Sequence, residues 1–403
     1  MRVTFVQFVN EYGGLQRCLL EFATSLSKHA QVSIVDPGTV CTEFALAAEA
    51  AGLDYHNLAA SEGFPHMKTG SGLLGAGLRI ARNLPRILSV RNWMVREVQR
   101  IQPDVMCSFD LRSAMFIGSS RALRSIPLVV QLHGWYVPPY ITAYGRWLMK
   151  HRASLVLAIS HQTRTAVRCA GVDPANILVL QNPIDVDAML RDADRPLAGE
   201  LPGQNAAIRM VLPGQLSRGK GQGVAVEALA KLVERGQDAV LWLAGRPAEG
   251  EEAYIEGVKR MAQQRGVAAR VAWLGLRNDL PQIMRRATVV VLPTLTEGHP
   301  RVVLEAMALG KPMVATPVGG VLDMILPELT GMLFEVGDAE GLSQCIQKLA
   351  ADPALAERVG SLGQLHARLN FNPQRHTRMF LEALEQAVRI TNRCGQAGQD
   401  RRP

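Results

Sequence analysis

The chain of 403 residues is poor in aromatic side chains, which make up 5% of it, and it has no long apolar run. A membrane-spanning helix needs roughly eighteen or more consecutive apolar residues, and the longest runs here, at 154–159 and 288–294, are only long enough for strands. The first residues also lack the apolar segment and cleavage site of a signal peptide. We therefore expect a cytoplasmic protein without a spanning helix.

Cysteine is scarce and scattered, and no two of the six cysteines have the spacing of a zinc or redox motif: they are Cys18, Cys41, Cys107, Cys169, Cys345 and Cys394. Free thiols in a reducing compartment are the expected state. The shortage of aromatic residues also argues against a surface on which nucleic-acid bases stack. We expect no nucleic-acid partner.

The sequence has the composition of a globular protein, with 48% hydrophobic and 20% charged residues. Its formal net charge of +8 favours an anionic partner, such as a phosphorylated substrate or a phospholipid surface. Charge alone does not choose between these partners.

Short β-branched runs alternate with longer amphipathic ones along the chain. Strands are expected at 3–9, 31–36, 104–109, 127–133 and 154–159, and again at 209–213, 239–245, 270–274, 288–293 and 312–316. This alternation predicts two doubly wound Rossmann-like α/β domains with parallel sheets. We place the first domain at 1–185 and the second at 186–373, with a helix at about 374–390 packing back on the first domain and a disordered tail at 391–403.

The sharpest motif follows the strand at 288–293 and reads Thr-Glu-Gly-His-Pro-Arg-Val-Val-Leu-Glu-Ala-Met-Ala from residue 296. Gly298 permits a tight turn, and Pro300 suits the entrance of a helix whose N–H groups face an incoming anion. Glu297 lies in the loop and Glu305 about a turn into the helix, so the two carboxylates can accept hydrogen bonds from hydroxyls along one ligand. We predict a diphosphate-containing ligand at this edge of the sheet.

A second motif, Gly-Gln-Leu-Ser-Arg-Gly-Lys-Gly at 214–221, nearly matches a P-loop. Gly221 stands where a P-loop has the hydroxyl residue that binds magnesium, which argues against a nucleotide hydrolase. Two weaker signals lie in the first half of the chain. Gly13 and Gly14 follow the first strand, and His133 ends another one, where ligands of α/β folds bind.

The frame Glu-Gly-x-Pro-x-Val-x-x-Glu-Ala-Met-Ala resembles the signature of the retaining glycosyltransferases of GT-B fold, group 1 (family four). The resemblance extends through Gly-Lys-Pro at 310–312, Thr-Pro-Val-Gly-Gly at 316–320 and Asn-Pro-Ile-Asp at 182–185. It implies two Rossmann-like domains facing across a cleft, a nucleoside-diphosphate sugar as donor, retention of anomeric configuration, and no metal.

The resemblance also implies roles for individual residues. The catalytic set is His133, Lys220, Arg218 and Glu297, and the donor-binding set is Gly13, Gly14, Gln215, Gly298, His299, Pro300, Arg301 and Glu305. In the family an arginine and a lysine neutralise the donor diphosphate, the first glutamate lies by the donor sugar, and the second holds the ribose. The family arginine falls on the neutral Gln215, so Arg218 is expected to supply that charge.

Two other patterns are tempting and are set aside. The Gly-x-Gly-x-x-Gly stretch at 70–75 has no strand before it and is expected to be a loop. The Asp-x-Asp pairs at 185–187 and 192–194 imitate a divalent-cation motif, but they lie about a hundred residues from the Glu297 motif and are taken as linker residues.

We therefore expect a metal-independent, retaining hexosyltransferase that needs no cofactor besides a UDP- or GDP-sugar. Its acceptor would be a glycan or a lipid-linked sugar in cell-surface polysaccharide or glycolipid synthesis. The alternatives are a sugar-nucleotide epimerase of the same fold and a non-enzymatic nucleotide- or RNA-binding protein.

Residues 63–103 carry seven arginines and lysines against the single acid Glu97, interleaved with leucine, isoleucine and tryptophan. This composition is typical of a helix at an anionic membrane surface, and we expect peripheral contact with the inner face of the membrane. A helix that packs its leucines on the domain core would have the same composition.

Overall fold

The computed structural model describes residues 1–9, 13–38, 41–58, 73–134 and 141–399, with the backbone alone at 73–82 and 394–399. The chain divides into two compact units. The first consists of Met1–Leu180 with Gln374–Pro403, and the second is Gln181–Pro373. The boundaries expected from the sequence are 185 and 373.

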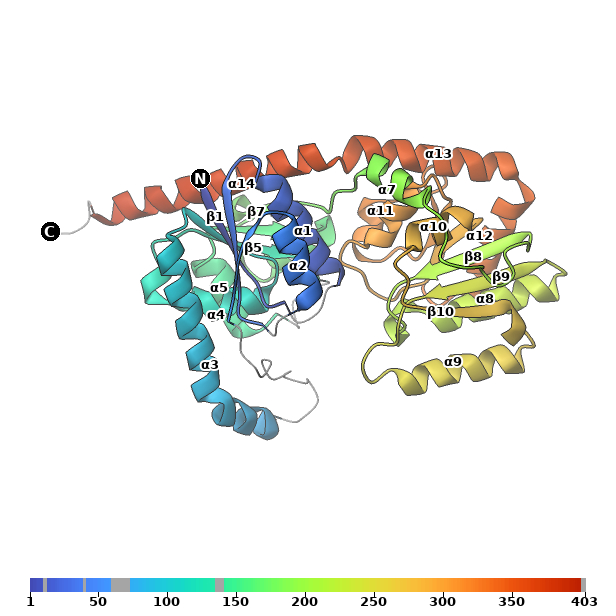
Figure 1. The fold of residues 1–403 in the computed structure, drawn as a ribbon, viewed down its shortest axis with the longest axis horizontal. Helices are drawn as coiled ribbons and strands as arrows, with labels where there is room; N and C mark the ends of the chain where they lie inside the picture. Colours follow the sequence, from blue (N-terminus) through green and yellow to red (C-terminus); the bar gives the residue numbers. More distant parts are fainter. Residues whose placement is uncertain (10–12, 39–40, 59–72, 135–140, 400–403) are drawn as a thin grey trace. The chain divides into compact units, whose positions relative to one another are not determined.

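The first unit is built on a seven-stranded parallel sheet in the order β3-β2-β1-β4-β5-β6-β7 (Figure 1). Its strands are β1 (Arg2–Val6), β2 (Gln31–Asp36), β3 (Asp54–Asn57), β4 (Val105–Ser108), β5 (Leu128–Leu132), β6 (Leu155–Ala158) and β7 (Ile177–Val179). Its helices are α1 (Gly14–Leu26), α2 (Thr42–Ala50), α3 (Leu73–Ile101), α4 (Leu111–Gly118), α5 (Ala143–His151) and α6 (His161–Cys169). The order changes direction between β1 and β4, which makes that point the topological switch of the sheet.

Each face of this sheet packs against its own helices. One core contains side chains of α1 and α2, including Phe22 and Phe44, with alternate strand residues such as Phe5. The other contains residues of α3, α4, α5 and α6, including Met94 and Leu148. The strands are therefore covered on both faces, which explains their nearly continuous apolar sequences.

The long helix α14 (Pro373–Gln399) joins the first unit, although it follows the second unit in sequence. Phe380, Leu384 and Ala387 are buried in the core with α1. The helix continues through residues 391–399, where a disordered tail was expected, and only 400–403 lie outside the description. The Thr391 hydroxyl contributes to this difference, because it lies 2.8 Å from that of Ser154 and ties this turn to the unit.

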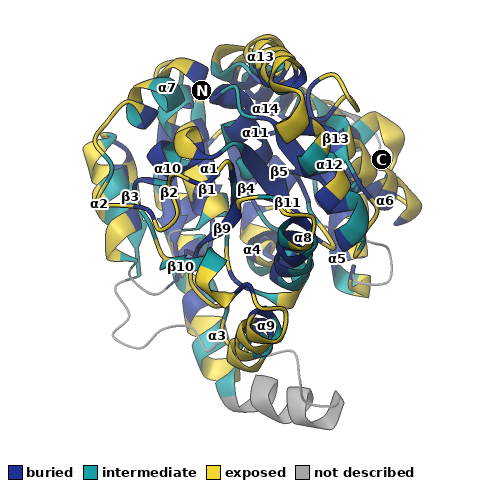
Figure 2. Cartoon of the chain, turned by 90° about the vertical axis from the view of Figure 1, so that its right-hand side faces the viewer, coloured by how far each residue is buried: buried dark blue, intermediate teal, exposed yellow. Residues whose placement is uncertain are grey.

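The second unit contains a six-stranded parallel sheet in the order β10-β9-β8-β11-β12-β13. Its strands are β8 (Ile208–Pro213), β9 (Ala239–Ala244), β10 (Val271–Gly275), β11 (Val289–Leu292), β12 (Met313–Ala315) and β13 (Met332–Leu333). Its helices are α7 (Val186–Ala193), α8 (Gln222–Glu234), α9 (Glu252–Gln264), α10 (Leu280–Arg286), α11 (Arg301–Ala308), α12 (Ala339–Ala351) and α13 (Pro353–Asn370). Figure 2 shows the central strands β9 and β11 buried and the outer faces of α9 and α13 exposed.

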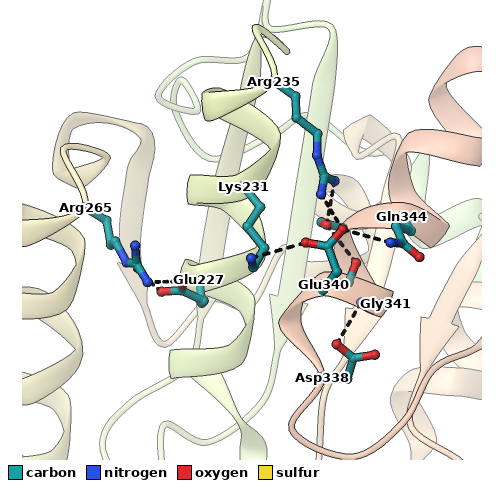
Figure 3. Close-up of polar contacts among 9 residues, drawn as sticks. Glu227, Lys231, Arg235, Arg265, Asp338, Glu340, Gly341 and Gln344 are labelled. Carbon is teal, nitrogen blue, oxygen red and sulfur yellow. Dashed lines mark hydrogen bonds and ion pairs between the residues drawn. The ribbon is translucent and has the colours of Figure 1, made fainter.

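A network of charged residues fastens α8 to α12 in the second unit (Figure 3). Glu340 pairs with Arg235 and with Lys231, whose Nζ lies 3.2 Å from its Oε2. The hydrogen bond from Gln344, followed by those from Arg235 and Lys231, holds the pKa of Glu340 below its usual range. Because Glu340 is matched by two nearby cations, we interpret this network as structural.

The prediction of two Rossmann-like units with parallel sheets is confirmed. The strands that the sequence analysis missed, β3, β7 and β13, all lie at sheet edges. The β3 sequence, Asp-Tyr-His-Asn, has few apolar residues, as an edge strand can tolerate, whereas β7 and β13 are apolar but only 3 and 2 residues long, too short to show a strand pattern. Among the residues described, no helix is long and apolar enough to cross a membrane. Of the Gly-rich stretch at 70–75, expected to be a loop, residues 70–72 lie outside the description and 73–75 begin α3.

Candidate functional site

The candidate site lies at the switch point of the second sheet, between β8 and β11. Two loops leave the carboxyl ends of these neighbouring strands, at 214–221 and 293–300. The loops are bonded to each other, since the Thr294 hydroxyl and the Leu295 N–H both donate to the carbonyl of Gly219 at 2.9 Å. The two strongest sequence motifs therefore form one structure, although about eighty residues separate them.

Gly221 makes this close approach possible. Its φ of 72° is left-handed, and a Cβ there would lie 2.0 Å from the carbonyl oxygen of Pro293. No side chain larger than hydrogen fits at that distance. The glycine that breaks the P-loop pattern is thus required by the contact between the two loops.

The first loop is held from within by Gln222, which is fully buried. Its Nε2 donates to the carbonyl of Gln215 at 3.2 Å, and its Oε1 accepts from the N–H of Ser217 at 3.3 Å. The side chain thereby fixes the turn that carries Lys220. Sequence reasoning missed this role, although a glutamine at the start of an apolar helix face was a usable signal.

Lys220 and Glu297, one from each loop, form an ion pair. The Glu297 side chain is only 10% exposed and that of Lys220 30% exposed, so water screens the pair weakly. Both residues were predicted as site residues, and the structure brings them together. An ammonium beside a carboxylate can bind an anion while the carboxylate accepts hydrogen bonds from hydroxyls.

The second loop leads directly into α11 and is packed from two sides. Asn182 donates from Nδ2 to the carbonyl of His299 at 3.1 Å, and the His299 ring packs against Phe371 at 5.7 Å. A Cβ on Gly320 would lie 2.2 Å from the Gly298 carbonyl oxygen, so the loop at 316–320 closes over this turn. Neither Asn182 nor Phe371 was predicted as a supporting residue.

Pro300 precedes α11 and stands at its N-cap, as the motif predicted. Arg301 opens the helix, and its Nε lies 3.8 Å from Oε1 of Glu305, one turn further on. The two side chains are 18% and 17% exposed. This end of α11 therefore offers backbone N–H groups, a guanidinium and a carboxylate along one helical face.

Arg218 lies on the opposite side of the first loop. Its guanidinium carbon is 5.5 Å from the ring centre of Tyr254 on α9, and its backbone N–H donates to Glu251 at 3.3 Å. Lys220 faces the β11 side, so the two cations of this loop diverge. Gln215, the position of the family arginine, is exposed.

The remaining predicted residues belong to the first unit. Gly13 is the N-cap of α1 and its N–H donates to the side chain of Gln16 at 3.2 Å, while Gly14 begins the helix. His133 follows β5 and stacks on Phe109, with ring centres 4.7 Å apart. These residues end or follow the strands near the switch point of their own sheet.

A buried carboxylate near the same switch point was missed. Asp36, at the end of β2, accepts hydrogen bonds from the N–H groups of Val9 and Gly38 at 3.0 and 2.7 Å, and from Tyr55 and Asn57 at 2.7 and 3.3 Å. It thereby joins the segments that follow β1 and β2 to strand β3. Burial raises its pKa to about 6 against the opposing effect of these hydrogen bonds.

The two Asp-x-Asp pairs are part of α7 and its ends, not of a linker. Asp185 caps the helix by accepting from the Ala188 N–H at 2.9 Å, and Asp187 pairs with Arg368. Asp192 and Asp194 pair with other arginines. Throughout the part of the chain described, no three histidine, cysteine or acidic residues lie together as metal ligands would.

Comparison with known proteins agrees with this arrangement. Residues 12–188 match Glycosyltransferase Family 4, and residues 204–366 match Glycosyl transferases group 1. Together these matches cover most of the chain, which belongs to the group 1 glycosyltransferases of GT-B fold.

Relatives and solved structures extend the comparison. The chain is 28% identical over 257 residues to D-inositol 3-phosphate glycosyltransferase of Mycobacterium tuberculosis, covering 62% of this chain and 52% of that protein. It thus spans about half the length of the curated relatives it matches. HepE of Anabaena in complex with UDP-glucose has a TM-score of 0.78 at 22% identity, covering 96% of this chain and 99% of that one. Sucrose-phosphate synthase of Thermosynechococcus elongatus has a TM-score of 0.75 at 17% identity, covering 96% of this chain and 98% of that one.

Proposed function

We propose that the protein transfers a sugar from a nucleoside-diphosphate sugar to an acceptor hydroxyl, with retention of anomeric configuration. The observation that carries the proposal is the pairing of Lys220 with Glu297 beside the start of α11, on which Glu305 follows. The family membership supports it, as do the related structures solved with UDP and UDP-glucose.

The arrangement suits the chemistry of this transfer. As the bond to the donor sugar breaks, negative charge develops on the leaving diphosphate, and cations and N–H dipoles stabilise it without further reorganisation. Lys220 and the N–H groups of α11 provide both. Glu297 accepts hydrogen bonds from the donor sugar, and Glu305 from the ribose.

Because these groups neutralise the diphosphate, we propose that the reaction needs neither a metal nor an additional cofactor. Activity is then expected to survive EDTA. An enzyme that EDTA silences and Mn²⁺ restores would contradict this part of the proposal.

A glycan or lipid-linked acceptor at an anionic membrane surface is proposed as the second substrate. Two exposed leucines on α3, Leu84 and Leu88, lie one turn apart, whereas Val90 and Met94 pack into the core. Residues 111–172 of the same unit contain no acidic residue, and there the exposed Trp147 stacks on Tyr144 of α5. Exposed apolar and aromatic groups among cations suit a lipid interface.

The experiment that tests the proposed function is a screen of UDP-, GDP-, ADP- and dTDP-sugars for binding, for hydrolysis and for transfer to membrane extracts. Transfer that leaves the anomeric configuration unchanged by NMR supports the proposal. Conversion of one nucleotide sugar to its epimer without an acceptor would instead establish the epimerase alternative. Binding of none of these donors would contradict both.

A further inference from the structure

We propose that Arg301 is the second cation of the diphosphate site and stands in for the family arginine that is replaced here by Gln215. The inference rests on the proposed function, because it concerns how the same site holds its donor. In this proposal Arg218 holds the first loop against α9 and does not bind the donor diphosphate.

The position of Arg301 on α11 places it on the same helical face as Glu305. Arg301 and Glu305 are four residues apart and their charged groups lie 3.8 Å from each other, so both face the same side of the helix. Four residues advance about 6 Å along a helix axis, which is roughly the distance from a ribose hydroxyl to the first phosphate of a nucleotide. If Glu305 holds the ribose, Arg301 lies one turn nearer the helix N-terminus, where the diphosphate would lie.

The charge balance of the site also favours a second cation. A nucleoside diphosphate carries two or more negative charges, and Lys220 already shares its charge with Glu297. Gln215 is neutral and contributes no positive charge. Arg301 adds a second cation, which is paired with Glu305 only at the longer distance of 3.8 Å, and a guanidinium can bind two phosphate oxygens at once.

The environment of Arg301 is mostly enclosed and well anchored. Its side chain is 18% exposed, so its charge is screened less than that of a surface arginine. It follows Pro300, whose turn is fixed by the contacts of Gly298 and His299 described above. The guanidinium is thus presented from a helix whose start is held in place.

The contacts of Arg218 explain why it does not take this role. Its guanidinium lies over Tyr254, and its backbone N–H is bonded to Glu251. Both partners are at or beside α9, which follows β9, whereas Glu297 follows β11 on the other side of β8. Arg218 therefore fastens the first loop to α9.

A simpler role for Arg301 would be to orient Glu305 alone. The two roles differ in what the nucleotide must contain. If Arg301 binds the diphosphate, its removal weakens the binding of ligands that carry both phosphates. If Arg301 only orients the Glu305 carboxylate toward the ribose, its removal weakens the binding of the diphosphate and of its parent nucleoside equally.

The test measures the dissociation constants of Arg301→Gln, Arg218→Gln and the control Arg260→Gln by calorimetry. Arg260 is an exposed arginine of α9 in the same unit, so its removal changes net charge equally. The probes are UDP and GDP, each compared with its nucleoside. Arg301→Gln is expected to weaken binding of the preferred diphosphate roughly 10- to 100-fold while changing nucleoside binding less than about threefold. Arg218→Gln is expected to weaken diphosphate binding less than about threefold.

A rescue experiment sharpens the test. Adding Gln215→Arg to Arg301→Gln restores the family arginine and is expected to recover most of the lost diphosphate affinity. Equal losses for nucleoside and diphosphate, or a larger loss in Arg218→Gln than in Arg301→Gln, would overturn the proposal. A wild-type protein that binds neither diphosphate would contradict the proposed function itself. Diphosphate binding that is the same in the wild type and in Arg301→Gln would contradict only the role of Arg301.

Discussion

At the scale of single residues, the two glutamates of the site are not equivalent. Glu297 is paired with Lys220, whereas Glu305 lies near Arg301 on α11. Removing Glu297 therefore also changes the environment of Lys220. A partly buried cation without its partner destabilises the folded protein, and it binds other anions more readily.

We predict that Glu305→Ala mainly weakens nucleotide binding and that Glu297→Gln mainly lowers turnover. Each loss of a charge-assisted hydrogen bond costs about 1.5–3 kcal/mol. Steady-state kinetics separate the two, with Glu305→Ala expected to raise KM for the donor and Glu297→Gln to reduce kcat. If both variants bind and turn over the donor as the wild type does, the site is assigned wrongly.

Asp36 gives a prediction about stability and pH. Its pKa of about 6 in the folded protein lies above the ordinary aspartate value of 3.8. Between about pH 4 and pH 6 the folded state keeps a proton that the unfolded chain has released, so the free energy of unfolding falls as pH rises through this window. A difference of about two units between the folded and unfolded pKa values corresponds to a change of roughly 2–3 kcal/mol in the free energy of unfolding.

The measurement compares urea unfolding of the wild type and Asp36→Asn from pH 4 to pH 7. Asparagine does not titrate, so the variant should lack this part of the pH dependence, while its remaining slope comes from other groups. Parallel curves for the two proteins across the window would show that Asp36 does not titrate there.

At the scale of elements, α3 combines two surfaces. Val90, Met94 and Val98 pack into the core at four-residue spacing, and Leu84 and Leu88 are 46% and 43% exposed. The core-packing alternative explains the first set but not the exposure of the second set. An anionic lipid surface would cover it.

We predict that binding to vesicles rises with their content of anionic lipid and falls with salt. Each basic residue near the surface contributes about 1 kcal/mol, so replacing Arg79, Arg82 and Arg86 with glutamine should reduce co-sedimentation by far more than tenfold. The structure adds the paired change Leu84→Ser and Leu88→Ser, which removes apolar contact at constant charge.

A control variant replaces Arg378 and Arg389, two exposed arginines of α14, with glutamine. This helix packs on the opposite face of the sheet from α3, so its variant should bind vesicles nearly as the wild type does. Equal co-sedimentation of the wild type with neutral and anionic vesicles would contradict a membrane role and favour a soluble acceptor.

At the scale of the whole molecule, the first unit depends on the end of the chain. Phe380 of α14 is fully buried and packs edge-on against Phe22 at 5.1 Å, and Phe5 lies 6.1 Å away. Residues 1–180 alone would leave these rings exposed to water. The unit is therefore complete only after the second unit has been synthesised.

We predict that Phe380→Ala lowers the stability of the first unit by about 3–5 kcal/mol, because it removes a large buried ring. Hydrogen exchange should show loss of protection in β1 and β4 while β8 and β11 keep theirs. Glu382→Ala, an exposed position on the same helix, is the control. Equal loss of protection in both units would mean that they unfold as one.

The order of residues along the chain is enough to predict the alternation of strands and helices, because buried parallel strands are locally apolar and their helices are locally amphipathic. It also determined the turn and helix that carry Glu297, Pro300 and Glu305, since these residues are neighbours along the chain. Short edge strands and the end of α14 could not be predicted from the sequence, because they depend on the residues that pack beside them.

Contacts between residues that are distant in sequence depend on the folded structure. Lys220 and Glu297 are 77 positions apart and pair because Gly221 allows their loops to touch. Arg218, two positions from Lys220, turns instead to Tyr254 on α9. Local sequence limits which conformations a loop can adopt, but the direction of a long flexible side chain depends on the partner that the fold places within its reach.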